Sequence, residues 1–141
     1  MRLSARIVLA SALLASQPAW AGCDRPAPVH FPAGAFATDL SGGVARGERA
    51  CFTIGAGAGQ TLSVTQRKSP DDNIVFQIYQ PGWKITPEPG GFDLSANALT
   101  GAADGDDARA WSGKLPAKGN YLLVVGTTRG GGEYNLRIEI R

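Results

Sequence analysis

The chain has 141 residues, with 14 basic and 12 acidic side chains and a formal net charge of +2. Two of the basic residues, Arg2 and Arg6, lie in the first few positions, so the rest of the chain carries 12 basic and 12 acidic residues and no net charge. A balanced chain without a basic patch or interleaved aromatic residues argues against a nucleic-acid partner.

The N-terminal 21 residues predict a secretory signal peptide. Arg2 and Arg6 precede a short apolar segment, 7–15, and Ala19-Trp20-Ala21 follows as a small-x-small cleavage site. The apolar segment is too short to span a bilayer as a mature helix. We therefore expect cleavage after Ala21 and an exported protein, periplasmic or secreted, whose single domain covers residues 22–141.

The two cysteines, Cys23 and Cys51, are expected to form a disulfide, because an exported chain meets an oxidising compartment. A lipoprotein is the alternative, since Trp20-Ala21-Gly22-Cys23 resembles a bacterial lipobox that would place a lipid on Cys23. Such boxes normally carry an aliphatic residue at the position of Trp20, and this favours the disulfide.

The mature sequence predicts strands and no helix. Prolines make 24–33 an extended entry segment, and Ser41-Gly42-Gly43 is expected to turn the chain. Residues 87–107 have little periodicity and are expected to form a long connection. The 19 glycines and nine prolines are typical of an all-β domain, here a single jelly-roll-like β-sandwich of about eight strands. The segments that predict strands are 35–40, 49–54, 61–66, 74–80, 108–111, 121–125 and 134–140, with weaker ones at 83–86 and 92–94.

The C-terminal stretch carries the clearest strand signals. Tyr121–Val125 is continuously apolar, which predicts a strand covered on both faces. Residues 134–140 alternate between apolar and polar, which predicts a strand with one wet face. We expect the two strands to form a hairpin across a glycine-rich loop, 126–132. Arg129 makes that loop the best candidate for a recognition surface, because a guanidinium suits carboxylates and loops on rigid strands often bind partners.

Catalytic and metal chemistry find little support. His30 is the only histidine and lies in the proline-rich entry segment, so a nucleophile lacks an evident base. The acidic stretches Asp71-Asp72-Asn73 and Asp104-Gly105-Asp106-Asp107 have oxygen ligands that calcium accepts, yet they do not match the EF-hand pattern. Solvated turns are the favoured interpretation. We predict a protein that is not an enzyme and has no cofactor.

Three aromatic residues have two interpretations. Tyr79, Trp83 and Trp111 could form a platform for sugars, or they could pack into the core. Packing is favoured because aromatic side chains bury large apolar areas in a small domain.

Residues 115–140, LPAKGNYLLVVGTTRGGGEYNLRIEI, resemble the end of bacterial pre-peptidase C-terminal-like domains, and more particularly the periplasmic inhibitors of goose-type (g-type) lysozyme. The resemblance extends to Val29-His30-Phe31 and to 47–64, although Glu48 stands where those inhibitors have a tyrosine. It implies a non-enzymatic periplasmic binding protein whose partner is a g-type lysozyme. Thr128, Arg129 and Gly130 would form the partner-binding loop, with Arg129 blocking the enzyme's cleft. The alternative is a stand-alone pre-peptidase-like module that binds envelope polysaccharide or protein.

Overall fold

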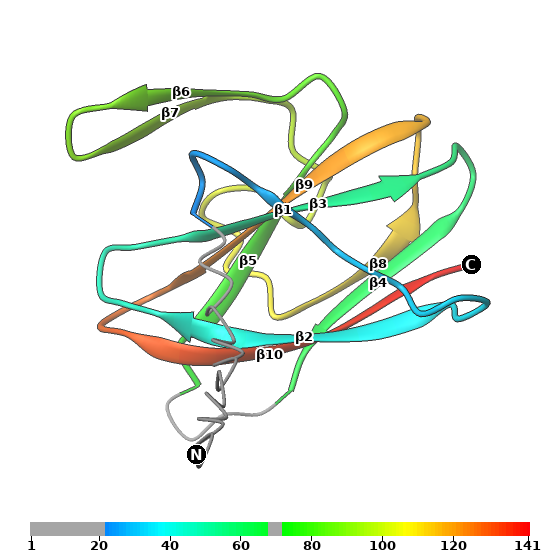
Figure 1. The fold of residues 1–141 in the computed structure, drawn as a ribbon, viewed down its shortest axis with the longest axis horizontal. Coiled ribbons are helices and arrows are strands. Elements are labelled where there is room, and N and C mark those ends of the chain that lie inside the picture. Colours follow the sequence, from blue (N-terminus) through cyan, green and yellow to red (C-terminus); the bar gives the residue numbers. More distant parts are fainter. Residues whose placement is uncertain (1–21, 68–71) are drawn as a thin grey trace, which may run out of the picture.

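The computed structural model describes residues 22–67 and 72–141, and in these residues it contains ten strands and no helix (Figure 1). The expected signal peptide, residues 1–21, lies outside the described residues, and no described helix is long and apolar enough to cross a membrane. The strands are β1 (Ala27–Pro28), β2 (Ala37–Val44), β3 (Ala50–Ala56), β4 (Thr61–Gln66), β5 (Ile74–Tyr79), β6 (Lys84–Glu88), β7 (Gly91–Ser95), β8 (Ala110–Lys114), β9 (Gly119–Thr127) and β10 (Gly132–Ile140).

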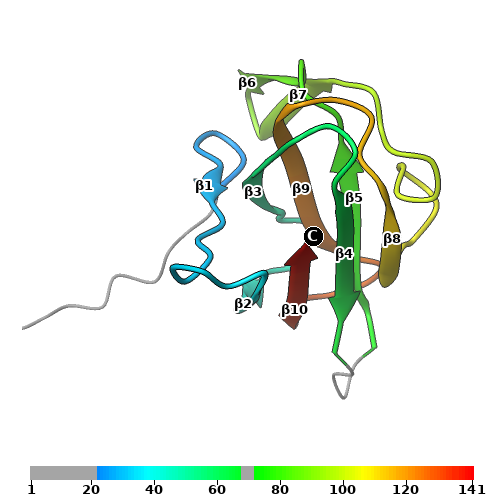
Figure 2. The same cartoon turned by 90° about the vertical axis from the view of Figure 1, so that its right-hand side faces the viewer.

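Eight of the strands form a sandwich of two four-stranded sheets (Figures 1 and 2). The first sheet has the order β1-β3-β9-β5 and the second the order β2-β10-β4-β8. From β2 to β5, and again from β8 to β10, each successive strand lies in the opposite sheet. This wrapping around the core is jelly-roll-like, and the predicted all-β sandwich is confirmed. β6 and β7 form a separate two-stranded ribbon.

The main core lies between the two sheets and is built by alternation along the strands. In β3, Phe52 and Ile54 point inward, and in β4 Leu62 and Val64 do the same. Each buried side chain of this size stabilises the fold by roughly 1.5–3 kcal/mol relative to exposure. The other large members of this core are Ile74, Phe76, Ile78, Leu99, Leu115, Tyr121, Leu123, Val125, Tyr134, Leu136 and Ile138.

A second, smaller cluster covers the outer face of the first sheet. Leu122 and Val124 of β9 point away from the main core and pack with the disulfide and Tyr79. The β6–β7 ribbon closes this cluster from outside with its half-buried apolar residues, and Figures 1 and 2 show the ribbon beyond the first sheet. β9 is therefore covered on both faces, and the prediction made from its continuous apolar run is confirmed.

The predicted C-terminal hairpin is wrong. β9 pairs with β3 and β5, whereas β10 pairs with β2 and β4 in the other sheet. The physical reason lies in the two patterns themselves. The continuously apolar β9 needs the sheet whose outer face is covered, while the alternating β10 suits the sheet whose outer face meets water. The glycine-rich loop consequently crosses between the sheets.

The turn expected at Ser41-Gly42-Gly43 is also absent, because β2 runs through these residues in register with β10. Gly42 serves side-chain packing. The Tyr134 ring, on the paired residue of β10, occupies the space that a Cβ on Gly42 would need. Gly43 has open space at the same position, since its nearest neighbour is the Gly132 carbonyl oxygen at 4.0 Å.

The irregular segment 96–109 covers an exposed strand edge. β5 is the last strand of the first sheet, and its free backbone N–H groups find acceptors in this segment. Phe76 donates to the Ala108 carbonyl and Ile78 to the Ala102 carbonyl, each at 2.9 Å. The segment lacks periodicity because it satisfies a neighbouring strand's hydrogen bonds and protects that edge from pairing with another chain.

The disulfide between Cys23 and Cys51 attaches the entry segment to β3, with the two Cα atoms 4.8 Å apart. Both cysteines are buried in the outer cluster. A bonded Cys23 has no thiol to accept a lipid, so the structure supports the disulfide over the lipoprotein alternative.

Removal of the disulfide should lower the stability of the sandwich. The combined substitution Cys23→Ala and Cys51→Ala removes the covalent link between two residues that are 28 positions apart in sequence. We expect a loss of about 3 kcal/mol and a fall in melting temperature of roughly 10 °C, measured by calorimetry. Reducing agent should lower the melting temperature of the wild type and leave the variant unchanged. An equal melting temperature for the two proteins would contradict this role.

The two neighbouring glycines of β2 should respond differently to an added methyl group. Gly42→Ala forces the Tyr134 ring out of its position, and overpacking of this kind costs about 1–3 kcal/mol. Gly43→Ala is the matched control, because its methyl group meets open space. Urea unfolding measures both variants, and coincident unfolding midpoints would show that Tyr134 does not need Gly42.

Candidate functional site

The loop between β9 and β10 presents Thr128, Arg129 and Gly130 to solvent. Its own hydrogen bonds hold it in a tight bend, in which the Thr127 hydroxyl donates to the Gly130 carbonyl at 2.6 Å. Gly130 has φ +57°, a backbone conformation that favours glycine. The three residues predicted to contact a partner are thus together and exposed on one bend.

Asn73, immediately before β5, fixes this bend from inside. Its side-chain amide donates to the carbonyl oxygens of Arg129 and Gly131, each at 2.8 Å. The backbone carbonyl oxygen of Asn73 accepts a 2.9 Å hydrogen bond from the Thr128 N–H. Asn73 is only 4% exposed and is the one buried polar side chain among the described residues. Three hydrogen bonds from a buried residue hold the loop on both sides of Arg129.

Two glycines allow the loop to approach its surroundings closely. A Cβ on Gly132 would lie 2.7 Å from the Asn73 side-chain oxygen, and a Cβ on Gly131 would lie 3.0 Å from the Val44 carbonyl. The glycine run therefore does not make a floppy linker here. It lets the loop pack between Asn73 and the end of β2.

The connection between β2 and β3 lies beside this loop at the same end of the sandwich (Figure 1). The Glu48 N–H donates to the Ala45 carbonyl at 3.0 Å, and Gly47 has φ +75°. A positive φ at the third position is the mark of a type II turn. Arg46 and Glu48 are both exposed on this turn.

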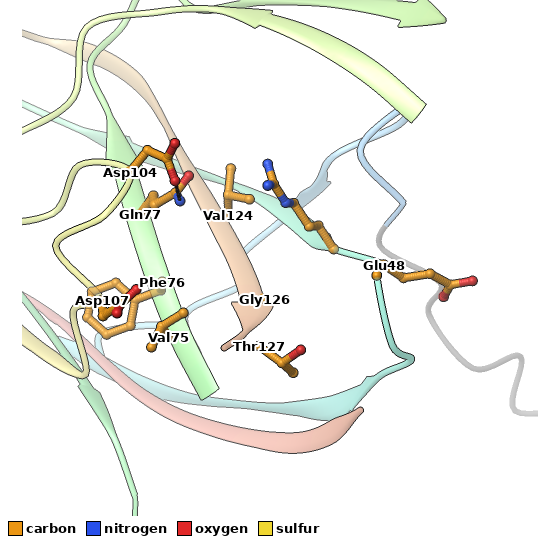
Figure 3. Close-up of a pocket in the computed structure, with 11 residues that line it drawn as sticks. Glu48, Val75, Phe76, Gln77, Asp104, Asp107, Val124, Gly126 and Thr127 are labelled. Carbon is orange, nitrogen blue, oxygen red and sulfur yellow. Dashed lines mark hydrogen bonds between the residues drawn. The ribbon is translucent and has the colours of Figure 1, made fainter. Parts of the chain in front are cut away.

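A polar groove of about 210 Å³ lies beside the same two connections, on the outer face of the first sheet (Figure 3). Asp104 and Gln77 lie at one end of it, while Thr127 is the last residue of β9 and Glu48 comes from the connection between β2 and β3. The Tyr79 hydroxyl donates to Gln77 Oε1 at 2.6 Å, and Gln77 Nε2 donates to Asp104 Oδ1 at 3.1 Å.

A tyrosine that is hydrogen-bonded to the groove's lining is kept neutral by its surroundings. Burial of the Tyr79 hydroxyl raises its pKa, the charge of Asp104 raises it further, and Arg49 opposes both effects. A phenol whose pKa is raised stays a neutral hydrogen-bond donor near pH 7. No histidine, cysteine or serine lines the groove; its polar lining includes the Thr127 hydroxyl and the carboxylates of Glu48, Asp104 and Asp107.

The remaining candidate residues do not come together. His30 is exposed in the entry segment. Asp72 pairs with Arg109 at 3.0 Å, and Asp106 accepts a hydrogen bond from the Ala103 N–H at 2.8 Å within its own turn. In residues 22–67 and 72–141, no group of three or more potential ligands lies close enough to hold a metal ion.

The aromatic residues considered for sugar binding are packed, and they belong to two different clusters. Tyr79 is buried in the outer cluster, and Trp83 packs against the same cluster with its indole N–H donated to the Asn120 carbonyl at 2.9 Å. Trp111 packs against the main core and donates to the Thr100 carbonyl at 2.9 Å. They form no shared platform, and the packing interpretation is the one that the structure supports.

Solved structures with the same fold include three periplasmic inhibitors of g-type lysozyme. PliG of Aeromonas hydrophila is 30% identical, with a TM-score of 0.62, and the match covers 82% of this chain and 96% of that one. PliG of Salmonella Typhimurium is 20% identical, with a TM-score of 0.56 and coverage of 82% and 97%. A mutant of Escherichia coli PliG is 20% identical, with a TM-score of 0.57 and the same coverage.

No protein-family model and no curated protein sequence matches the chain. The Aeromonas match spans almost the whole of that inhibitor, whereas the two at 20% identity show the shared fold alone. The chain belongs to the PliG family, the periplasmic lysozyme inhibitors of g-type lysozyme. The wider resemblance to pre-peptidase C-terminal-like domains stays a prediction.

Loss of the Asn73 amide should loosen the bend that carries Arg129. Asn73→Ala removes both donors, and a substitution that leaves such groups unpaired costs about 1–3 kcal/mol. We expect lower stability in urea and faster hydrogen exchange of the Thr128 N–H, measured by NMR. Asn135→Ala, on the exposed face of β10, is the matched control. Equal exchange rates at Thr128 in the two variants would show that Asn73 does not hold the loop.

Proposed function

We propose that the mature protein inhibits a g-type lysozyme by inserting the Arg129 loop into the enzyme's cleft. The observation that carries this proposal is the exposed arginine on a bend held from inside by Asn73. Membership of the PliG family supplies the class of partner. The protein is a binding protein and not an enzyme, and it is periplasmic or secreted. We further propose that residues 1–21 direct export and are removed after Ala21.

The chemistry of the cleft suits the arginine. Glycosidases generally use a pair of carboxyl groups around the bond that they cleave. A guanidinium presents a planar set of donors that can bind a carboxylate at two points. An arginine placed among such carboxyl groups would both block the substrate and gain charge-assisted hydrogen bonds.

The neighbours of Arg129 have supporting roles. Thr128 is exposed beside it and offers a hydroxyl to the rim of the cleft. Gly130 supplies the positive φ that closes the bend, and its carbonyl oxygen is held by the Thr127 hydroxyl. Because the bend is already formed, binding costs less ordering entropy than it would for a mobile loop.

A titration of purified mature protein against a g-type lysozyme tests the proposal. Lysis of peptidoglycan should fall with increasing protein, and Arg129→Ala should weaken inhibition at least about tenfold, as expected for a central arginine in an interface. Lys118→Ala, at the opposite end of β9, is the matched control for loss of one exposed positive charge.

Two outcomes would contradict the proposal. Full lytic activity at micromolar excess of the wild-type protein would remove lysozyme as the partner. Inhibition that is unchanged by Arg129→Ala would remove the arginine from the mechanism. Binding to an envelope glycan without inhibition would favour a pre-peptidase-like binding module instead.

A further inference from the structure

We propose that the end of the sandwich opposite the Arg129 loop binds the surface of an anionic phospholipid bilayer. This surface, which we call the basic end, consists of Phe36, Lys114, Lys118 and Arg141. Figure 1 shows the C-terminus, at Arg141, on the opposite side of the sandwich from the connection between β2 and β3. Membrane binding here is separate from lysozyme inhibition, because the basic end and the Arg129 loop share no residue.

Three exposed cations of the basic end come together only in the folded chain. The Thr61 N–H donates to the Arg141 carbonyl at 2.8 Å, and Thr61 pairs with Lys114 on its other side. Directly paired residues project from the same face of a sheet, and the strands on either side of β4 lie about 10 Å apart. Lys114 and Arg141 therefore share one face of the second sheet. Lys118 lies in the connection that follows β8, four residues after Lys114.

The segments that form this end carry no acidic side chain. They are 34–36, 57–60, 81–83 and 115–118, and none of them contains an aspartate or a glutamate. In residues 22–67 and 72–141, Lys114, Lys118 and Arg141 form no ion pair with a carboxylate side chain. Glu139, two residues before Arg141, pairs with Arg137 at 3.6 Å. A carboxylate at the chain's end would offset one of the three positive charges, which leaves two to attract an anionic surface.

Phe36 gives the basic end an apolar contact. It is 63% exposed and is the one exposed large hydrophobic residue among those that the structure describes. The Arg141 guanidinium lies over its ring, 5.8 Å from the centroid. A guanidinium that stacks on an aromatic ring keeps its donors available for phosphate oxygens. An exposed aromatic ring beside cations is also the combination that enters the interfacial layer of a bilayer.

An anionic bilayer is the partner that satisfies both features of the basic end. Its surface presents phosphate groups that attract the cations, and its acyl chains begin just below and accept an apolar ring. A soluble polyanion would satisfy the cations and leave Phe36 in water. The protein is periplasmic or secreted, and membranes enclose the periplasm. A molecule bound in this way would direct the Arg129 loop away from the membrane.

Sedimentation with lipid vesicles tests the proposal on the mature protein. Vesicles of phosphatidylglycerol and phosphatidylethanolamine should retain the protein at low salt, and neutral phosphatidylcholine vesicles should retain far less. Each lysine near an anionic surface strengthens binding about fivefold, so the combined substitution Lys114→Ala and Lys118→Ala should weaken it about twentyfold. Arg129→Ala is the matched control, because it removes an exposed cation at the opposite end and should leave vesicle binding unchanged.

Phe36 distinguishes a membrane contact from a purely electrostatic one. Phe36→Ser should weaken vesicle binding at least about threefold, whereas Phe36→Trp should retain it, because tryptophan suits the interface of a bilayer. Binding should also weaken as salt rises from about 50 to about 300 mM, since screening shortens the range of the charges. The substituted positions are all exposed, and calorimetry checks that the variants remain folded.

Three outcomes would overturn the proposal. Equal retention by anionic and neutral vesicles, or retention by neither, would remove the anionic bilayer as the partner. Unchanged retention of the double lysine variant would remove the basic end from the contact. Binding to soluble polyphosphate as tight as that to vesicles, with no effect of Phe36→Ser, would assign the basic end to a polyanion instead. The proposed function is tested separately, because the double lysine variant should inhibit lysozyme as the wild type does.

Discussion

The burial of β9 on both faces is the constraint on which the rest of the structure depends. One face lies on the main core, and the other is closed by the disulfide and the β6–β7 ribbon. The strand is also paired on both edges, with β3 and β5. A strand fixed on four sides leaves little freedom to the residues that follow it, so the position at which the chain leaves the first sheet is set before the Arg129 loop begins.

Local patterns in the sequence were sufficient to predict where the strands lie, but they were insufficient to predict which strands pair with each other. Apolar and polar residues alternate along 49–54 and 61–66 because one face of each strand is buried. This pattern can be recognised in each strand without knowing its neighbours. The partner of a strand depends on segments far away, and the run of glycines after β9 is compatible with a hairpin or with a crossing between sheets. Gly42 illustrates the same limit, because its reason is the Tyr134 ring on a strand that is distant in sequence.

The candidate site follows the same division. Arg129 could be selected from the sequence because it is a cation between two strong strands. Asn73 could not, since its partners lie 56 and 58 residues away and its neighbours Asp71 and Asp72 suggested a solvated turn. The one available signal for Asn73 was its position directly before a strongly apolar strand. A polar residue at that position can be buried at the edge of the core. The closeness of Gly131 to the connection between β2 and β3 could not be predicted either, because it exists only after the chain crosses between sheets.

The use of a buried asparagine to hold the loop has a consequence for how partner choice could be set. The Asn73 amide binds backbone carbonyl oxygens, which every residue possesses, so it fixes the bend whatever side chain occupies position 129. Its side-chain oxygen is buried without a hydrogen-bond partner among the described residues, which is a cost in stability. That cost is offset by separation of two tasks. The scaffold determines where the loop lies, and the exposed side chains at its tip can change without moving its backbone.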